Sequence, residues 1–135
     1  MKRNISIGID SKTDKPNVVH INNLSSLVNY SCDSISIDIL EFLQEKDHEQ
    51  IIKYLLEKLR PNGKLIITIN NAKNIAKDYA EAAISSGDFL QLFSNKQSLL
   101  TIESIYTFID FQTFDIVNID VSPTQIIAVV ERKNI

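Results

Sequence analysis

Two carboxylates near the middle of the chain are the residues best placed to do chemistry. Asp38 and Glu41 lie at the end of a run of alternating apolar residues, 34–40, which is typical of a central strand. Open α/β sheets bind their ligands just beyond the carboxyl ends of such strands. A carboxylate there can orient a substrate or accept a proton from it. We therefore expect a polar site at Asp38 and Glu41, although Glu41 could equally be a loop carboxylate or part of a helix start.

The other residue types that support catalysis or metal binding form no recognisable pattern. His20 and His48 are the two histidines, and neither lies at metal-ligand spacing from a cysteine or a carboxylate. Residues 47–49, Asp-His-Glu, point in different directions on a helix, so they cannot surround one metal ion, and we expect a solvated helix start there. The sequence has no Ser-His-Asp set, no phosphate-binding glycine loop and no CxxC pair. No metal site is predicted.

Length, composition and charge restrict the class of protein. The 135 residues, 44% of them hydrophobic, suit a single domain over residues 1–135 with one core. The net charge of −3 comes from interspersed acids and bases, without the basic cluster of a nucleic-acid-binding surface. No apolar run approaches the ~18 residues that cross a membrane, and no signal peptide is expected. The single cysteine, Cys32, should pack as a small apolar residue in a cytoplasmic, reducing compartment.

The first part of the chain predicts two strands with a short connection. Residues 4–9 alternate apolar and small or polar side chains, and residues 18–21 form a second short apolar run. Residues 10–17 separate them, whereas a parallel crossover normally takes about a dozen residues or more and usually contains a helix. If the two strands are parallel, the first crossover helix must be reduced or missing.

Periodicity and turn residues divide the rest of the chain. Asp47, with Gln50 three residues later, predicts a helix start, and Pro61-Asn-Gly63 would end that helix and lead into a strand over 64–69. A helix over 72–84 that stops near Gly87 and a helix after the N-cap Thr101 follow. Strands over 114–121 and 125–131 must be antiparallel neighbours because their connection is short. On the first and third of these helices the residues expected to face inward are Ile51, Ile52, Leu55, Leu56 and Leu59, then Ile102, Ile105, Tyr106 and Ile109. On the second helix Ala76, Tyr79, Ala80 and Ala83 are expected to share one side.

Three segments of the chain resemble class I S-adenosylmethionine-dependent methyltransferases. Residues 39–43, I-L-E-F-L, stand where that family usually has V-L-E-H-L, and residues 59–67, L-R-P-N-G-K-L-I-I, are similar to its L-K-P-G-G-K-L-I-I. Residues 101–104, T-I-E-S, are similar to the opening of the family's last helix. The resemblance implies a Rossmann-like α/β fold whose mostly parallel sheet is closed by an antiparallel C-terminal hairpin.

The same resemblance implies S-adenosylmethionine as cofactor and a set of residues to hold it. Gly8, Ile9 and Asp10 stand where the family has a G-x-G-type loop, whose glycines let the backbone approach the cofactor. Asn22, or Asn23 in a shifted register, falls where the family's second strand ends in an acid that binds the ribose. Both asparagines could equally end the strand and turn the chain.

Asp38 completes the cofactor-binding set that the resemblance implies, and Asp38 and Glu41 are its catalytic candidates. The sequence departs from the family in several of these places at once. The loop has one glycine where the family has two or three, the second strand ends in asparagine where the family has an acid, and Phe42 replaces the family's histidine.

Three readings of function remain open. The first is methyl transfer to a small-molecule or protein acceptor. The second is a degenerate, non-catalytic methyltransferase-fold protein that acts as an interaction or assembly module, because fold does not imply function. The third, a receiver-like or flavodoxin-like domain, lacks the early paired acids and the late lysine. In all three cases the uncharged run 125–130, in a C-terminal edge hairpin, predicts pairing with a second copy or a protein partner if nothing covers it.

Overall fold

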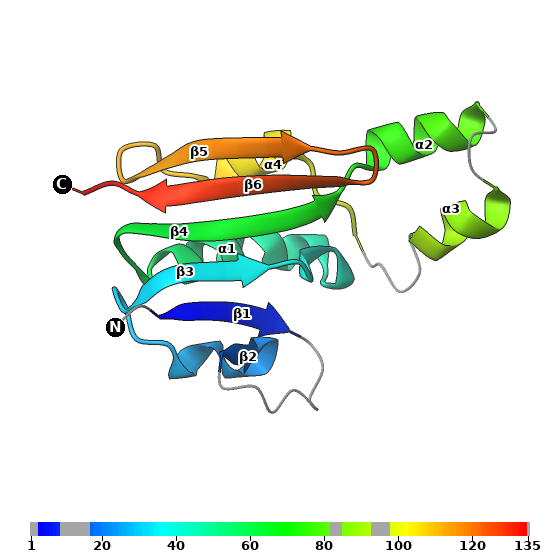
Figure 1. Ribbon diagram of the computed structural model, residues 1–135. Coiled ribbons are helices and arrows are strands. Elements are labelled where there is room, and N and C mark those ends of the chain that lie inside the picture. Colours follow the sequence, from blue (N-terminus) through cyan, green and yellow to red (C-terminus); the bar gives the residue numbers. More distant parts are fainter. Residues whose placement is uncertain (1–2, 9–16, 82–84, 93–97, 135) are drawn as a thin grey trace.

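The computed structural model describes residues 3–8, 17–81, 85–92 and 98–134, and these form one six-stranded sheet with helices (Figure 1). The strands are β1 (Asn4–Gly8), β2 (Val18–His20), β3 (Cys32–Ile37), β4 (Leu59–Asn70), β5 (Phe114–Val121) and β6 (Gln125–Arg132). The α-helices are α1 (Glu45–Leu56), α2 (Ala72–Ala80), α3 (Ser86–Leu92) and α4 (Ile102–Phe108), and the 3-10 helices are η1 (Ile21–Ser26) and η2 (Leu40–Phe42).

The sheet has the mixed topology that the sequence predicts. Its strand order is β2-β1-β3-β4-β6-β5. The pairs β1–β2, β1–β3 and β3–β4 are parallel, whereas β6 is antiparallel to both β4 and β5. The fold class, a mostly parallel sheet closed by an antiparallel hairpin, is therefore confirmed. The predicted reduction of the first crossover helix falls on residues 9–16, which lie outside the described residues.

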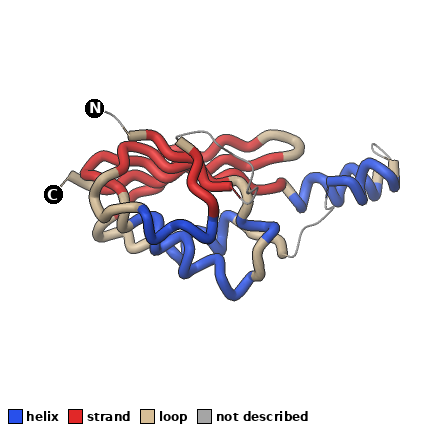
Figure 2. Tube along the Cα trace, turned by 90° about the horizontal axis from the view of Figure 1, so that it is seen from below, coloured by secondary structure: helices blue, strands red, loops and turns tan. Residues whose placement is uncertain are grey.

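One face of the sheet carries the hydrophobic core. Successive side chains of a strand point to opposite faces, so Ile5 and Ile7, Ile35 and Ile37, and Leu65 and Ile67 all point the same way, and each is at most 4% exposed. The helices α1 and α4 cover this face (Figure 2). Buried residues of these helices, such as Ile52 and Ile105, complete the core, which also includes Cys32.

The opposite face, here called the open face, has a different composition. Its residues are Ser6 on β1, Ser34 and Ser36 on β3, Lys64, Ile66 and Thr68 on β4, and Ile127, Val129 and Glu131 on β6. All of these side chains are half-buried or exposed. Among the described residues no helix lies over this face, because α1 and α4 are on the other side and α2 and α3 extend past the end of the sheet (Figures 1 and 2).

Several predicted elements differ in detail. The first helix begins at Glu45 after the N-cap Gln44, so Asp47 lies in its first turn and the predicted cap is wrong. It also ends at Leu56, earlier than predicted, and residues 59–63 already belong to β4. Gly87 does not stop a helix but lies within α3.

One predicted face and one predicted edge are also wrong. The side of α2 with Ala76, Tyr79 and Ala80 is exposed, and the buried residue of this helix is Ile75; Ala83 lies outside the described residues. Tyr106 on α4 is 45% exposed and stacks on Phe111 instead of facing inward. The run 125–130 belongs to β6, which has β4 on one side and β5 on the other, so it is not an edge. The C-terminal edge is β5.

No helix in the described part of the chain is long and apolar enough to span a membrane. The described elements belong to one sheet and one core, and the single domain over 1–135 stays a prediction.

Candidate functional site

The candidate site lies where the chain reverses its direction across the sheet. From β1 the chain passes to β2 on one side, and β3 then pairs with β1 on the other side. Ligands of open α/β sheets bind outside the carboxyl ends of the strands at such a switch point. Gly8 ends β1 and Asp38 directly follows β3, so the fold brings these two predicted residues to the same edge of the sheet.

Asp38 is the exposed carboxylate of this edge. It follows Ile37, the last buried residue of β3, and its own side chain is exposed. Asp38 and Thr68 line two hollows: one of about 170 Å³ on the open face with Ser6, Ser36 and Ile66, and one of about 190 Å³ beyond the strand ends. Each hollow alone is smaller than the roughly 300 Å³ at which small-molecule sites begin. A ligand of cofactor size would therefore have to extend over both or beyond them.

Glu41 has a different environment from Asp38. It lies in η2, is 3% exposed, and both of its carboxylate oxygens accept hydrogen bonds from the backbone. The N–H of Asn70 donates to Oε1 at 2.9 Å, and the N–H of Leu100 donates to Oε2 at 3.0 Å. Glu41 thus fastens the end of β4 and the segment before α4 to the same edge. Its predicted catalytic role stays a prediction, and its contacts are those of a positioning residue.

His48 connects η2 to the segment before α4 by contacts of its ring with Leu40 and Ser98. It is buried, so the prediction of a solvated helix start is wrong. It is 1% exposed, and its Nε2 lies 2.8 Å from the carbonyl oxygen of Leu40 and 2.9 Å from Oγ of Ser98. Because a carbonyl oxygen can only accept, Nε2 carries a hydrogen and donates it to Leu40. The Ser98 hydroxyl in turn donates to the carbonyl oxygen of Leu43 at 2.7 Å.

A sequence signal for the burial of His48 exists. His48 precedes Ile52 by four residues and Leu55 by seven, so it lies on the apolar face of α1. Its other ring nitrogen, Nδ1, is buried and has no hydrogen-bond partner among the described residues. No group of three or more metal-binding side chains occurs in the described part of the chain. The contacts of its Nε2 with Leu40 and Ser98 make His48 part of the scaffold of the site.

Three of the remaining predicted site residues, Gly8, Asn22 and Asn23, lie in the described part of the chain. Gly8 is where the sequence places it, and a Cβ built there would meet Val18 Cγ1 at 3.6 Å, an ordinary contact. Asn22 and Asn23 are exposed in η1, and the Asn22 N–H donates to Nδ1 of His20 at 3.0 Å. Ile9 and Asp10 lie outside the described residues. The cofactor-binding set therefore stays a prediction, with Gly8 and Asp38 as the pair that the described fold brings to one edge.

Sequence comparison gives no relatives from which a function could be transferred. No protein-family model matches the chain, and no curated protein sequence matches it.

Comparison of structures does find similar proteins. A methyltransferase dependent on S-adenosylmethionine from Archaeoglobus fulgidus is similar with a TM-score of 0.69 and 13% identity, over 97% of this chain and 86% of that one. A second one, from Mesorhizobium loti, has a TM-score of 0.65 and 10% identity over 96% and 90% of the two chains. The plantazolicin methyltransferase BpumL, in complex with SAH, has a TM-score of 0.65 and 11% identity over 97% and 67%. The chain therefore has the Rossmann-like fold of class I methyltransferases, as the sequence resemblance implies.

Proposed function

We propose that this protein binds S-adenosylmethionine at the carboxyl ends of β1 and β3 and transfers its methyl group to a small-molecule or protein acceptor. The observation that carries the proposal is Asp38, an exposed carboxylate at the switch point of a sheet with the methyltransferase fold. It lines both neighbouring hollows. Carboxylates at such positions accept hydrogen bonds from ligand hydroxyl groups.

The residues present fit one part of such a cofactor. Asp38 offers acceptor oxygens, and among the described residues a Cβ built at Gly8 would meet Val18 Cγ1 at 3.6 Å, an ordinary contact. Asn22 and Asn23 are exposed in η1, next to the end of β2, and their side-chain amides can accept a hydrogen bond but carry no charge. When bound, S-adenosylmethionine supplies an electrophilic methyl group.

The chain's own residues would then contribute mainly position. Glu41, through Asn70 and Leu100, holds the end of β4 and the segment before α4 at the edge of the sheet. Asp38, with its exposed carboxylate, would orient the acceptor or accept a proton from it. Most of the rate enhancement would come from holding the acceptor in line with the methyl group.

A second function, that of a non-catalytic interaction or assembly module, is favoured by the contacts of Glu41. Two carboxylates were candidates for catalysis, and both oxygens of this one are engaged by backbone N–H groups. Phe42 also stands where the family that the sequence resembles usually has the histidine of its V-L-E-H-L segment. If the cofactor does not bind, the fold would serve only to present surfaces.

Calorimetric titration with S-adenosylmethionine and S-adenosylhomocysteine separates the two functions. The first predicts binding that Asp38→Ala and Gly8→Val abolish. The matched control is Asp120→Ala, which removes an exposed aspartate on β5. No heat at millimolar ligand would contradict the first function and leave the second. Binding that survives Asp38→Ala would contradict the placement of the site.

A further inference from the structure

Strand β5 forms one edge of the sheet, with β6 on one side and no described strand on the other. It has eight residues, whereas β2 at the opposite edge has three. The side chains of Val117 and Val121 on β5 are 48% and 67% exposed. An edge strand offers a row of unpaired N–H and C=O groups that can pair with a further strand. The edge of β5 is therefore the part of the sheet best suited to bind another chain.

The side chains of β5 form two rows of different chemistry. The row on the covered face pairs with every second residue of β6, and it consists of Phe114, Ile116, Ile119 and Val121. The row on the open face consists of Asp115, Asn118 and Asp120. Val117 has no partner on β6, because β5 has an irregularity of the β-bulge type there. The strand therefore has the same pattern from either end: an apolar residue, an aspartate, an isoleucine and one of the two central residues.

We infer that the protein forms a two-fold dimer in which β5 pairs antiparallel with β5 of a second copy. If the axis passes between Val117 and Asn118, all eight residues of the strand are paired. The pairs, each formed twice, are Phe114–Val121, Asp115–Asp120, Ile116–Ile119 and Val117–Asn118. The first three of these pairs join side chains on the same face of the sheet, and two of them are apolar. The contact is closed and isologous, and it joins the two sheets into one.

The bulge favours a second copy over an unrelated strand as the partner. A bulge bends its strand and interrupts regular pairing, and it is one of the devices that protect sheet edges. In the proposed register, Val117 of each copy lies opposite Asn118 of the other, so the two bulges coincide and bend both strands alike. A regular strand lacks this match.

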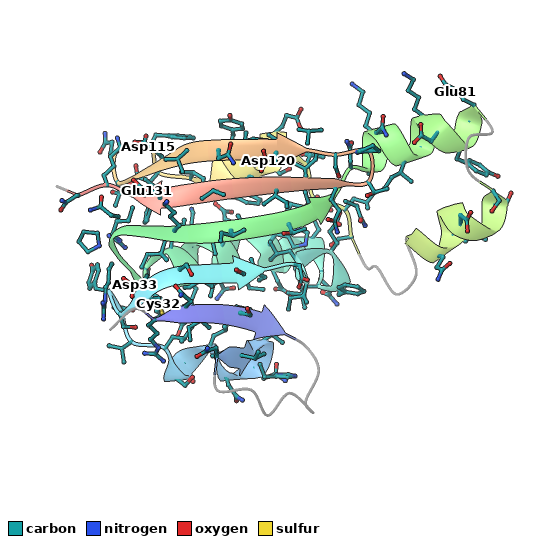
Figure 3. All side chains as sticks on the ribbon, viewed as in Figure 1. Cys32, Asp33, Glu81, Asp115, Asp120 and Glu131 are labelled. Carbon is teal, nitrogen blue, oxygen red and sulfur yellow. The ribbon has the colours of Figure 1, made fainter. Side chains whose placement is uncertain are left out.

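The two aspartates are the unfavourable part of the contact, since like charges directly opposite each other destabilise a strand pair. Figure 3 shows Asp115 and Asp120 near opposite ends of β5. Lys133 Nζ lies 3.7 Å from Asp115 Oδ1 and offsets one of the two negative charges in each pair. Asp120 forms no ion pair with another described residue. Its charge therefore limits the strength of the dimer.

Pairing through β5 leaves the proposed cofactor site free. The helices α1 and α4 lie on the covered face, and α2 and α3 extend past the end of the sheet (Figures 1 and 2). The strands β6 and β4 separate β5 from β3, which Asp38 directly follows. The dimer can therefore form whether or not a cofactor binds, and its test is independent of the proposed function.

Sedimentation equilibrium of the purified protein tests the dimer with two variants of opposite expected effect. We expect a dimer that Val117→Asp weakens about tenfold or more, because it adds two like charges beside the axis. Asp120→Lys should strengthen it about tenfold, because each contact with Asp115 becomes a pair of opposite charges. Both residues are exposed, so both variants should fold.

Two controls make the same changes of charge away from β5. Val28→Asp alters a residue before β3 that is 63% exposed, and Glu81→Lys alters an exposed residue at the end of α2 (Figure 3). Neither control should change the dissociation constant. A monomer at millimolar concentration would overturn the inference. A dimer that Val117→Asp and Asp120→Lys leave unchanged, or shift in the same direction, would also overturn it, because it would use another surface or register.

Cross-linking tests the register itself. Cys32 is fully buried, so introduced cysteines would be the accessible thiols. Mild oxidation of a mixture of the Val117→Cys and Asn118→Cys proteins should yield a mixed covalent dimer, identified by its mass. A mixture of Val117→Cys and Val28→Cys should yield little. Equal yields from the two mixtures would contradict the proposed pairing.

Discussion

The two faces of the sheet were built from the same strands but with different residues. On the covered face, every second residue of β1, β3 and β4 is an isoleucine or a leucine, and these side chains are almost fully buried. On the open face, the positions between them carry serine, threonine, lysine and a few exposed aliphatic residues. The comparison shows that the covered face accounts for folding. It also shows that the open face and the strand ends next to it are where interaction with other molecules should be sought.

Replacing one residue on each face is the strongest test of this comparison. Ile35 is completely buried on the covered face, and Ser36 is its neighbour on the open face. We expect Ile35→Ala to lower the free energy of unfolding by about 2 to 5 kcal/mol, because it removes buried methyl groups and leaves a cavity. Ser36→Ala should change it by less than about 0.5 kcal/mol. Urea denaturation measures both, and equal effects would contradict the assignment of the two faces.

Gly63 and Gly8 differ in how closely other atoms approach the backbone. A Cβ at Gly63 would meet the carbonyl oxygens of Arg60 at 2.8 Å and Cys32 at 2.9 Å, whereas at Gly8 it would make only an ordinary contact. We expect Gly63→Ala to destabilise the protein by about 1 to 3 kcal/mol through overpacking. Gly8→Ala should alter the thermal midpoint little. A large loss of stability in Gly8→Ala would show that the end of β1 is packed more tightly than the structure indicates.

Substitutions of the two candidate carboxylates should also differ in their effect on the free energy of unfolding, by less than those of Ile35 or Gly63. Glu41→Gln keeps one acceptor oxygen but leaves the N–H of Asn70 or Leu100 without its partner, so we expect a loss of about 1 to 2 kcal/mol. Asp38→Asn, at an exposed position, should leave stability within about 0.5 kcal/mol of the parent. Chemical denaturation of the two variants side by side checks this. A destabilising Asp38→Asn together with a neutral Glu41→Gln would reverse their assigned roles.

The sequence predicts the scaffold well because strand and helix periodicity record which side chains are buried. The strands, the antiparallel C-terminal hairpin, the burial of Cys32 and the Thr101 cap, whose Oγ1 accepts from the Ser104 N–H, follow from local patterns. The mostly parallel order of the other strands is what the family resemblance implies. The last strand was misjudged as an edge because strand order depends on pairing between distant segments, which no local pattern contains. Periodicity groups Ala76, Tyr79 and Ala80 on one side of α2 but does not show what covers that side, which is exposed in the structure.

The candidate site was harder to predict, since the roles of its residues depend on tertiary contacts. Asp38 and Glu41 are three residues apart and look alike in the sequence. Their environments differ because Leu100, far along the chain, donates its N–H to Glu41 while Asp38 stays exposed. His48 was misjudged for a similar reason, since its partner Ser98 is 50 residues away.

The central claim is that the edge of the sheet at Gly8 and Asp38 binds the cofactor. Titration of the ¹⁵N-labelled protein with S-adenosylhomocysteine, followed by amide chemical shifts, tests it most directly. The account predicts saturable shifts that cluster at Gly8, Asp38 and Thr68 and disappear in Asp38→Ala. Shifts that cluster elsewhere, or none at millimolar ligand, would contradict it.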